Sequence, residues 1–166
     1  MHYGKINTTD IANGPGVRVS LFVSGCRNHC KGCFNQETWD FNYGNVFGHK
    51  ELDELLESLD KDYISGLTIL GGDPFEPENI RAVYIISLAV KATFPDKNVW
   101  VYTGYTFEYL KDVYPQYLMQ HIDVLVDGRY IEEQRDITLR FRGSKNQRLI
   151  DIQASLKEDR VVLIED

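Results

Sequence analysis

Three cysteines within a stretch of eight residues are the side chains of this sequence best suited to chemistry. Cys26, Cys30 and Cys33 are the only cysteines of the 166-residue chain, and their spacing is Cys-x3-Cys-x2-Cys. An odd number of thiols packed this closely does not suit a small secreted domain, whose disulfides join cysteines in pairs across distance. We therefore predict a reducing, cytoplasmic compartment and a metal centre held by this loop.

The three thiols are compatible with two kinds of metal site. A structural zinc ion takes four ligands, and the candidates for the fourth are His29, which is adjacent to Cys30, and His49, whose spacing is not diagnostic. A 4Fe-4S cluster is normally held by four cysteines. Three cysteines would leave one iron open to a substrate or cofactor, which is an arrangement for catalysis rather than for simple electron transfer.

The rest of the chain predicts alternating strands and helices. Runs of apolar residues indicate strands, and leucines at i, i+3, i+4 and i+7 indicate a helix. The expected strands are 17–23, 67–70, 99–103 and 122–126, with weaker candidates at 137–141 and 161–164. The expected helices are 52–59, from Pro77 to about Phe94, and from about Thr106 to an interruption near Pro115.

Strands that alternate with helices indicate βαβ crossovers and a mostly parallel sheet. A complete (β/α)₈ barrel takes about 250 residues, so we expect a partial, open β/α barrel in a single domain over residues 1–166. Ligands of such sheets bind at the carboxyl ends of the strands. Four segments are expected at that edge: the cysteine loop, Gly71-Gly72-Asp73-Pro74, Tyr102-Thr103-Gly104 and Asp127-Gly128-Arg129.

The composition argues against several classes of partner. The chain has 18 Lys and Arg against 25 Asp and Glu, a formal net charge of −7, whereas a general nucleic-acid-binding protein carries a basic face. No apolar run approaches the ~20 residues of a membrane span, and the first residues do not have the pattern of a signal peptide. Basic side chains are concentrated from Arg135 to Arg148, which is either a solvated face or a strip that docks a partner protein.

Two motifs together resemble those of the radical S-adenosylmethionine (SAM) superfamily. One is the cysteine pattern, and the other is Gly71-Gly72-Asp73-Pro74, which is similar to the superfamily's Gly-Gly-Glu-Pro turn with aspartate for glutamate. Further segments resemble the glycyl-radical activating enzymes, and among them the subgroup that acts on anaerobic ribonucleotide reductase. These segments are Asn13 to Arg18, Leu21 to Cys26, Gly32 to Asn35 with Thr38-Trp39, Val101 to Tyr105, Val126 to Gly128 and Arg142 to Arg148.

The resemblance implies a radical SAM oxidoreductase with a 4Fe-4S cluster and SAM as cofactors. The cysteines would hold the cluster, which would receive an electron from a flavodoxin or ferredoxin and cleave SAM. The resulting radical would take a hydrogen atom from a glycine of the partner, an anaerobic ribonucleotide reductase. The residues implied to contact SAM are Gly32, Cys33, Phe34, Gly71, Gly72, Asp73, Pro74, Asp127 and Arg129.

Some of these residues have specific roles implied by the resemblance. Glycines at 71 and 72 would let the backbone approach SAM closely, so Gly72→Val is expected to weaken SAM binding and to spare the cluster. Asp73 would accept a hydrogen bond from the SAM ammonium, directly or through water. Phe34 would stack on adenine or pack in the core. Arg129 would pair with the SAM carboxylate or stay solvated, and Asp127 would support SAM or a nearby cation.

Two other functions remain open from the sequence. The first is an activating enzyme of pyruvate formate-lyase or another glycyl-radical enzyme, against which the short chain and the segment from Arg142 to Arg148 speak. The second is a non-catalytic zinc-binding module whose cysteine loop is structural. The chain could act as a homodimer or in a complex with the reductase.

Overall fold

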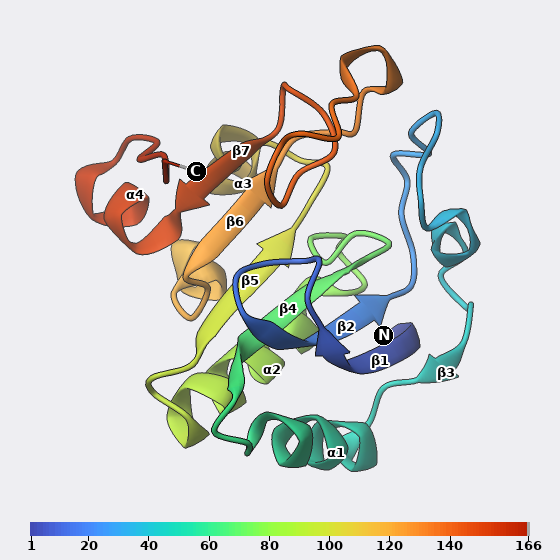
Figure 1. Ribbon diagram of the computed structural model, residues 1–166, viewed down its shortest axis with the longest axis vertical. Coiled ribbons are helices and arrows are strands. Elements are labelled where there is room, and N and C mark those ends of the chain that lie inside the picture. Colours follow the sequence, from blue (N-terminus) through green and yellow to red (C-terminus); the bar gives the residue numbers. More distant parts are fainter. Residues whose placement is uncertain (166) are drawn as a thin grey trace.

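The computed structural model describes residues 1–165, and its strands form one seven-stranded sheet in the order β3-β1-β2-β4-β5-β6-β7 (Figure 1). The strands are β1 (His2–Asp10), β2 (Val17–Val23), β3 (Asn45–Val46), β4 (Ile64–Gly71), β5 (Asn98–Tyr102), β6 (Val124–Asp127) and β7 (Arg148–Asp151). The helices are α1 (His49–Leu59), α2 (Ile80–Thr93), α3 (Phe107–Val113) and α4 (Ile152–Glu158), with short 3-10 helices at Gln36–Trp39, Gln116–Met119 and Glu132–Gln134.

The middle of the sheet is parallel and its edges are antiparallel. β2, β4, β5 and β6 pair in parallel with their neighbours, whereas β1, β3 and β7 add antiparallel strands outside them. The order ends on β3 at one edge and on β7 at the other, so the sheet is open. This confirms the predicted α/β class with an open sheet that is parallel in its middle.

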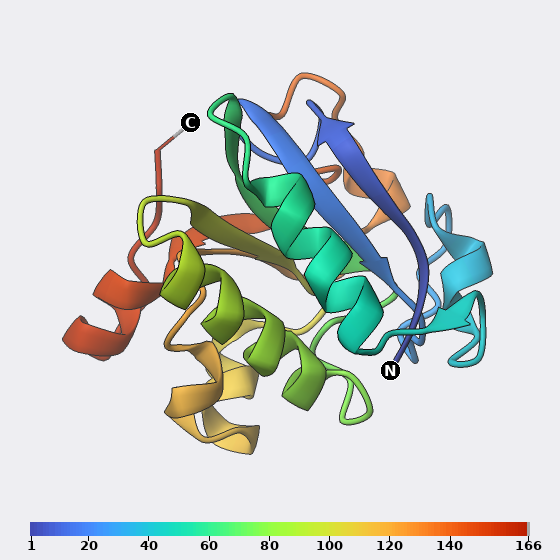
Figure 2. The ribbon, with the colours of Figure 1, turned by 90° about the horizontal axis from the view of Figure 1, so that it is seen from below.

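The two faces of the sheet are covered differently. Helices α1 and α2 lie side by side on one face (Figure 2), where Val99, Val101 and Leu125 belong to the main core. Successive side chains of a strand point to opposite faces, so Trp100 and Val126 lie on the other face in a second apolar cluster. The second face is left to loops rather than helices, which makes room for a site beside the strand ends.

Three predicted elements differ from the structure. The second predicted helix begins at Ile80 and not at Pro77, because the chain first turns and the Asn79 amide donates hydrogen bonds to the carbonyls of Ser24 and Asp73. Residues 137–141 form turns and bends instead of a strand. Residues 161–164 contribute one isolated bridge, which joins Leu163 to Ile150.

None of the helices within residues 1–165 is long and apolar enough to cross a membrane.

Candidate cluster and cofactor site

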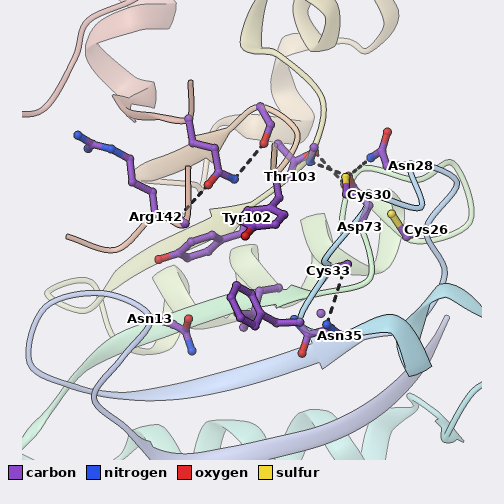
Figure 3. Close-up of a pocket in the computed structure, with 18 of the residues that line it drawn as sticks. Asn13, Cys26, Asn28, Cys30, Cys33, Asn35, Asp73, Tyr102, Thr103 and Arg142 are labelled. Atoms are coloured by element: carbon purple, nitrogen blue, oxygen red, sulfur yellow. Dashed lines mark hydrogen bonds between the residues drawn. The ribbon is translucent and has the colours of Figure 1, made fainter. Parts of the chain in front are cut away.

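The segments that follow the four parallel strands meet around one cavity of about 550 Å³ (Figure 3). The cysteine loop follows β2, and the turn at residues 71–73 follows β4. Residues 102–104 come from the end of β5, and Gly128 follows β6. Asn13 and Arg142 border the cavity from opposite sides in Figure 3. All four segments expected at this edge therefore contribute to a single site.

Cys26, Cys30 and Cys33 are free thiols and all three line the cavity. Burial raises the pKa of Cys26 to about 11. Burial, and after it the neighbouring Cys33, also raises the pKa of Cys30. These two thiols therefore keep their protons near neutral pH, and a metal centre bound by them would have to displace those protons. Three soft sulfur donors around one cavity fit an iron–sulfur cluster, which thiolates hold.

The histidines considered as a fourth zinc ligand lie outside the cavity lining. The ring of His29 stacks on Trp39 with centroids 4.3 Å apart and planes 8° apart, and His49 is the first residue of α1. Within residues 1–165, no three His, Cys, Asp or Glu side chains are gathered closely enough to hold a single metal ion.

Arg27 anchors the cysteine loop between the first two cysteines. Its backbone N–H and its guanidinium donate to the buried Glu76 carboxylate at 2.8 and 2.6 Å, and the guanidinium also contacts Glu78. The Arg27 guanidinium holds the pKa of Glu78 at about 2. Glu76 further accepts a hydrogen bond from the Tyr105 hydroxyl at 3.1 Å, so the loop is tied to segments after both β4 and β5.

Asp73 is the buried centre of the polar contacts beside the cysteines. Its carboxylate accepts hydrogen bonds from the N–H groups of Phe75 and Gly104 at 2.9 and 2.8 Å, from the Thr103 hydroxyl at 2.8 Å and from the Asn28 amide at 3.1 Å. Burial raises its pKa to about 6, although these hydrogen bonds act in the opposite direction. Four donors fill most of the acceptor positions of the two oxygens, so this carboxylate joins three loops of the site.

Gly71 and Gly72 are required by the packing of their turn. Gly71 has a φ of +110°, a conformation that side chains disfavour. A Cβ on Gly72 would lie 2.6 Å from the carbonyl oxygen of Gly25, the residue that precedes Cys26. Because a side chain there would press on the residue that precedes Cys26, the structure favours an effect of Gly72→Val on the cysteine loop as well as on SAM binding.

Three further residues were expected to contact SAM, and only one of them, Phe34, lines the cavity. Phe34 lines the cavity with 71% of its surface exposed, and its ring lies 5.7 Å from that of Tyr130. It is therefore not a core aromatic. Gly32 lies outside the lining, where a Cβ would collide with the Glu132 carboxylate, and Pro74 also lies outside the lining.

Asp127 and Arg129 contact other side chains and are not among the lining residues. The buried Asp127 carboxylate accepts two hydrogen bonds from Arg148 at 2.9 and 2.5 Å and one from the Phe107 N–H at 2.8 Å. Arg129 donates from Nε to the Asn28 side-chain oxygen at 3.0 Å. The two residues join loops around the site, while Gly128 between them reaches the cavity.

Asn28, Thr103 and Gly104 belong to the site although none of them was among the residues expected to contact SAM or the cluster. All three line the cavity and contact Asp73. The signal for Asn28 was its position between two cysteines. Thr103 and Gly104 belong to a segment that was expected at this edge, but no contact was assigned to either residue.

Comparison with known proteins agrees with this arrangement. A family model described as a 4Fe-4S single cluster domain matches residues 12–150. The chain is 45% identical over 149 residues to the anaerobic ribonucleoside-triphosphate reductase-activating protein of Vibrio cholerae, covering 89% of this chain and 96% of the relative. Proteins of the same name from phage T4 and Escherichia coli K12 are 43% and 38% identical, covering 90% and 89% of this chain and 93% and 96% of the relatives. The chain belongs to the family of anaerobic ribonucleoside-triphosphate reductase-activating proteins.

Proposed function

We propose that this chain is a radical SAM enzyme that activates anaerobic ribonucleotide reductase by forming a glycyl radical on it. Cys26, Cys30 and Cys33 would hold a 4Fe-4S cluster, and this cluster together with SAM would supply the one-electron radical chemistry needed to remove a hydrogen atom from a glycine Cα of the reductase. A reduced flavodoxin or ferredoxin is the proposed electron donor, and the reducing cytoplasm is the proposed compartment.

One observation carries the proposal more than any other. The three cysteines and the turn at Gly71, Gly72 and Asp73 line the same cavity, although about 40 residues separate them in the chain. A site for reductive cleavage of SAM needs a metal centre and a cofactor pocket within contact distance, because the electron passes directly to the bound cofactor. The relatives, which are named as activators of the reductase, support the choice of substrate.

The chain's own residues have three tasks in this reaction. The cysteine loop binds the cluster, and because the pKa values of Cys26 and Cys30 are raised, cluster assembly releases protons. The Asp73 carboxylate keeps the cysteine loop and the neighbouring turns in one arrangement. Phe22 and Leu70 give the cavity an apolar wall that limits the access of water.

The residues expected to contact SAM form two groups, those that line the cavity and those that do not. Five of the expected residues line the cavity and are proposed to touch SAM: Cys33, Phe34, Gly71, Gly72 and Asp73. The exposed ring of Phe34 offers a face for adenine. The other residues expected from the sequence are proposed to act by holding the backbone around the cofactor. These residues are Gly32, Pro74, Asp127 and Arg129.

Anaerobic reconstitution with iron and sulfide tests the proposal. We expect a brown protein that converts SAM to 5′-deoxyadenosine when reduced and that produces a glycyl radical signal in electron paramagnetic resonance when the reductase is added. Cys30→Ala should abolish SAM cleavage. Lys31→Ala is the matched control, because the adjacent Lys31 side chain is exposed and has only a 3.7 Å ion pair with Glu133.

Two results would contradict the proposal. A colourless protein that copurifies with zinc and does not cleave SAM would indicate a structural zinc module. A radical formed on pyruvate formate-lyase but not on the reductase would indicate an activating enzyme of another glycyl-radical enzyme.

A further inference from the structure

Of the three most exposed large hydrophobic side chains within residues 1–165, two line the cavity and the third is adjacent in the chain to lining residues. They are Ile137, Ile11 and Phe34, which are 85%, 75% and 71% exposed. Ile137 and Phe34 line the cavity, and Ile11 directly precedes two lining residues, Ala12 and Asn13. We call these three side chains the apolar rim.

The apolar rim is assembled by the fold. Ile11 lies between β1 and β2, Phe34 lies in the cysteine loop, and Ile137 lies in the long loop between β6 and β7, seen at the top of Figure 1. Single exposed hydrophobic residues are ordinary on protein surfaces. Three of them brought from distant parts of the chain to one cavity or to residues next to its lining are less ordinary, because exposed apolar groups that gather in one place mark interaction sites.

Positive charge accompanies the apolar rim. Arg135, Arg140 and Lys145 are exposed on the same loop as Ile137, and the Arg135 guanidinium lies 6.0 Å from the ring of Phe34. From Arg135 to Lys145 this loop has four basic side chains and one acidic one, Asp136, which lies 3.9 Å from Lys145. The loop is therefore a basic segment of a chain whose formal charge is −7. Such a region favours a partner with acidic side chains.

Abstraction of a hydrogen atom from a glycine Cα requires that a partner backbone reach the cavity. Glycine has no side chain, so the residues that flank it must supply the recognition. The apolar rim borders the opening through which that backbone has to enter.

We propose that the apolar rim and its basic neighbours dock the segment of the reductase that carries the target glycine, and that this segment presents apolar side chains accompanied by acidic ones. This inference rests on the proposed function. The apolar side chains would bury the rim, and the acidic ones would face Arg135 and Arg140.

Serine substitutions in the rim test the apolar contacts. Ile11→Ser and Ile137→Ser should each weaken the affinity for the anaerobic reductase of the same organism by about tenfold or more, because central apolar side chains carry much of the energy of an interface. Ile85→Ser is the matched control, because Ile85 is also exposed but lies on α2, away from the cavity. Affinity is measured anaerobically by biolayer interferometry, together with the yield of glycyl radical.

Arg140→Glu tests the charge complementarity. We expect the wild-type affinity to fall as salt is added, because exposed charges are screened. The variant should bind at least about tenfold more weakly at low salt and show a smaller dependence on salt.

SAM cleavage without the reductase separates this inference from the proposed function. Ile11→Ser should release 5′-deoxyadenosine at the wild-type rate while its yield of glycyl radical falls.

If the wild-type protein does not cleave SAM, the proposed function fails. If SAM is cleaved but both rim variants keep full affinity and radical yield, or if Ile85→Ser is equally impaired, the docking surface is wrong. It is also wrong if the rim variants only abolish self-association, measured by sedimentation, because the rim would then join two copies of this chain.

Discussion

The side-chain amide of Asn28 donates a hydrogen bond to the Asp73 carboxylate at 3.1 Å. The oxygen of the same amide accepts a hydrogen bond from Arg129 at 3.0 Å. Gly104 makes this position possible, because a Cβ there would lie 2.4 Å from the Asn28 nitrogen. One short side chain between two cysteines thus connects the proposed cluster loop to the turn proposed to bind SAM and to the segment after β6.

Asn28→Ala should weaken SAM binding without preventing cluster assembly. The substitution removes one of the two donors to an Asp73 oxygen and frees the cysteine loop from its neighbours. The freed cysteine loop and Asp73 would have to be ordered when SAM binds, at a cost of up to about 1.5 kcal/mol, the contribution of a hydrogen bond to a charged group. We therefore expect up to roughly tenfold weaker binding of SAM to the reconstituted protein by calorimetry. Asn42→Ala, at an exposed position, should bind SAM normally. Unchanged affinity in Asn28→Ala would show that the connection is not needed.

The buried Asp73 should make the protein less stable as the pH rises toward 6. Its folded-state pKa is raised to about 6, above the value of about 3.9 for an unfolded chain. Between these values the folded state holds a proton that the unfolded state has released, so this carboxyl lowers the free energy of unfolding by at most about 1.4 kcal/mol per pH unit. Above pH 6 the contribution is constant.

Urea unfolding of the cluster-free protein at pH 4.5, 5.5 and 7 measures this effect. The free energy of unfolding of the wild type minus that of Asp73→Asn cancels the other titrating groups. This difference should fall between pH 4.5 and 5.5 and change little above pH 6. If the difference rises with pH, the pKa of Asp73 in the folded protein is lowered and not raised. The hydrogen bonds from Thr103 and Gly104 would then have a larger effect on this pKa than burial has.

Gly72→Ala should lower both the stability and the iron content of the reconstituted protein. The added Cβ would come within 2.6 to 2.9 Å of the backbone of Gly25, and backbone atoms in paired strand ends cannot easily yield. Gly48→Ala is the control, because a Cβ there would approach only the Glu51 side chain, at an ordinary 3.4 Å. Normal iron content in Gly72→Ala would show that the two strand ends can move apart.

The parallel strands and the cysteine loop could be predicted because their signals are local. β2 spans Val17–Val23 as predicted, since a short apolar run between glycine-rich turns has few other ways to fold. β1 was not predicted because its sequence, HYGKINTTD, is mostly polar and only Asp10 of its residues is buried. The position of β1 in the sheet depends on its pairing with β2, and the sequence of one segment does not reveal such a pairing.

The partners of individual site residues could not be predicted because they depend on register between distant strands. Asp127 stands at the end of a predicted strand, and the resemblance implied that it supports SAM or a nearby cation. The antiparallel register of β6 and β7 instead places Asp127 opposite Arg148. β7 itself was not predicted, so no feature near residue 127 indicated that its carboxylate would be neutralised by an arginine.

Arg148→Ala should be among the most destabilising single substitutions at the edge of the site. It leaves the Asp127 carboxylate buried with one remaining hydrogen bond, from the Phe107 N–H. Removing one partner of a buried ion pair costs about 3 kcal/mol or more, somewhat less here because Arg148 is 30% exposed.

Arg160→Ala, whose ion pair with Glu158 is exposed, should change the free energy of unfolding by less than about 0.5 kcal/mol. The double variant Arg148→Ala/Asp127→Asn should recover part of the loss in urea unfolding, because it removes the unpaired charge. If the double variant is no more stable than Arg148→Ala, the loss comes from packing of the Arg148 side chain and not from the buried carboxylate.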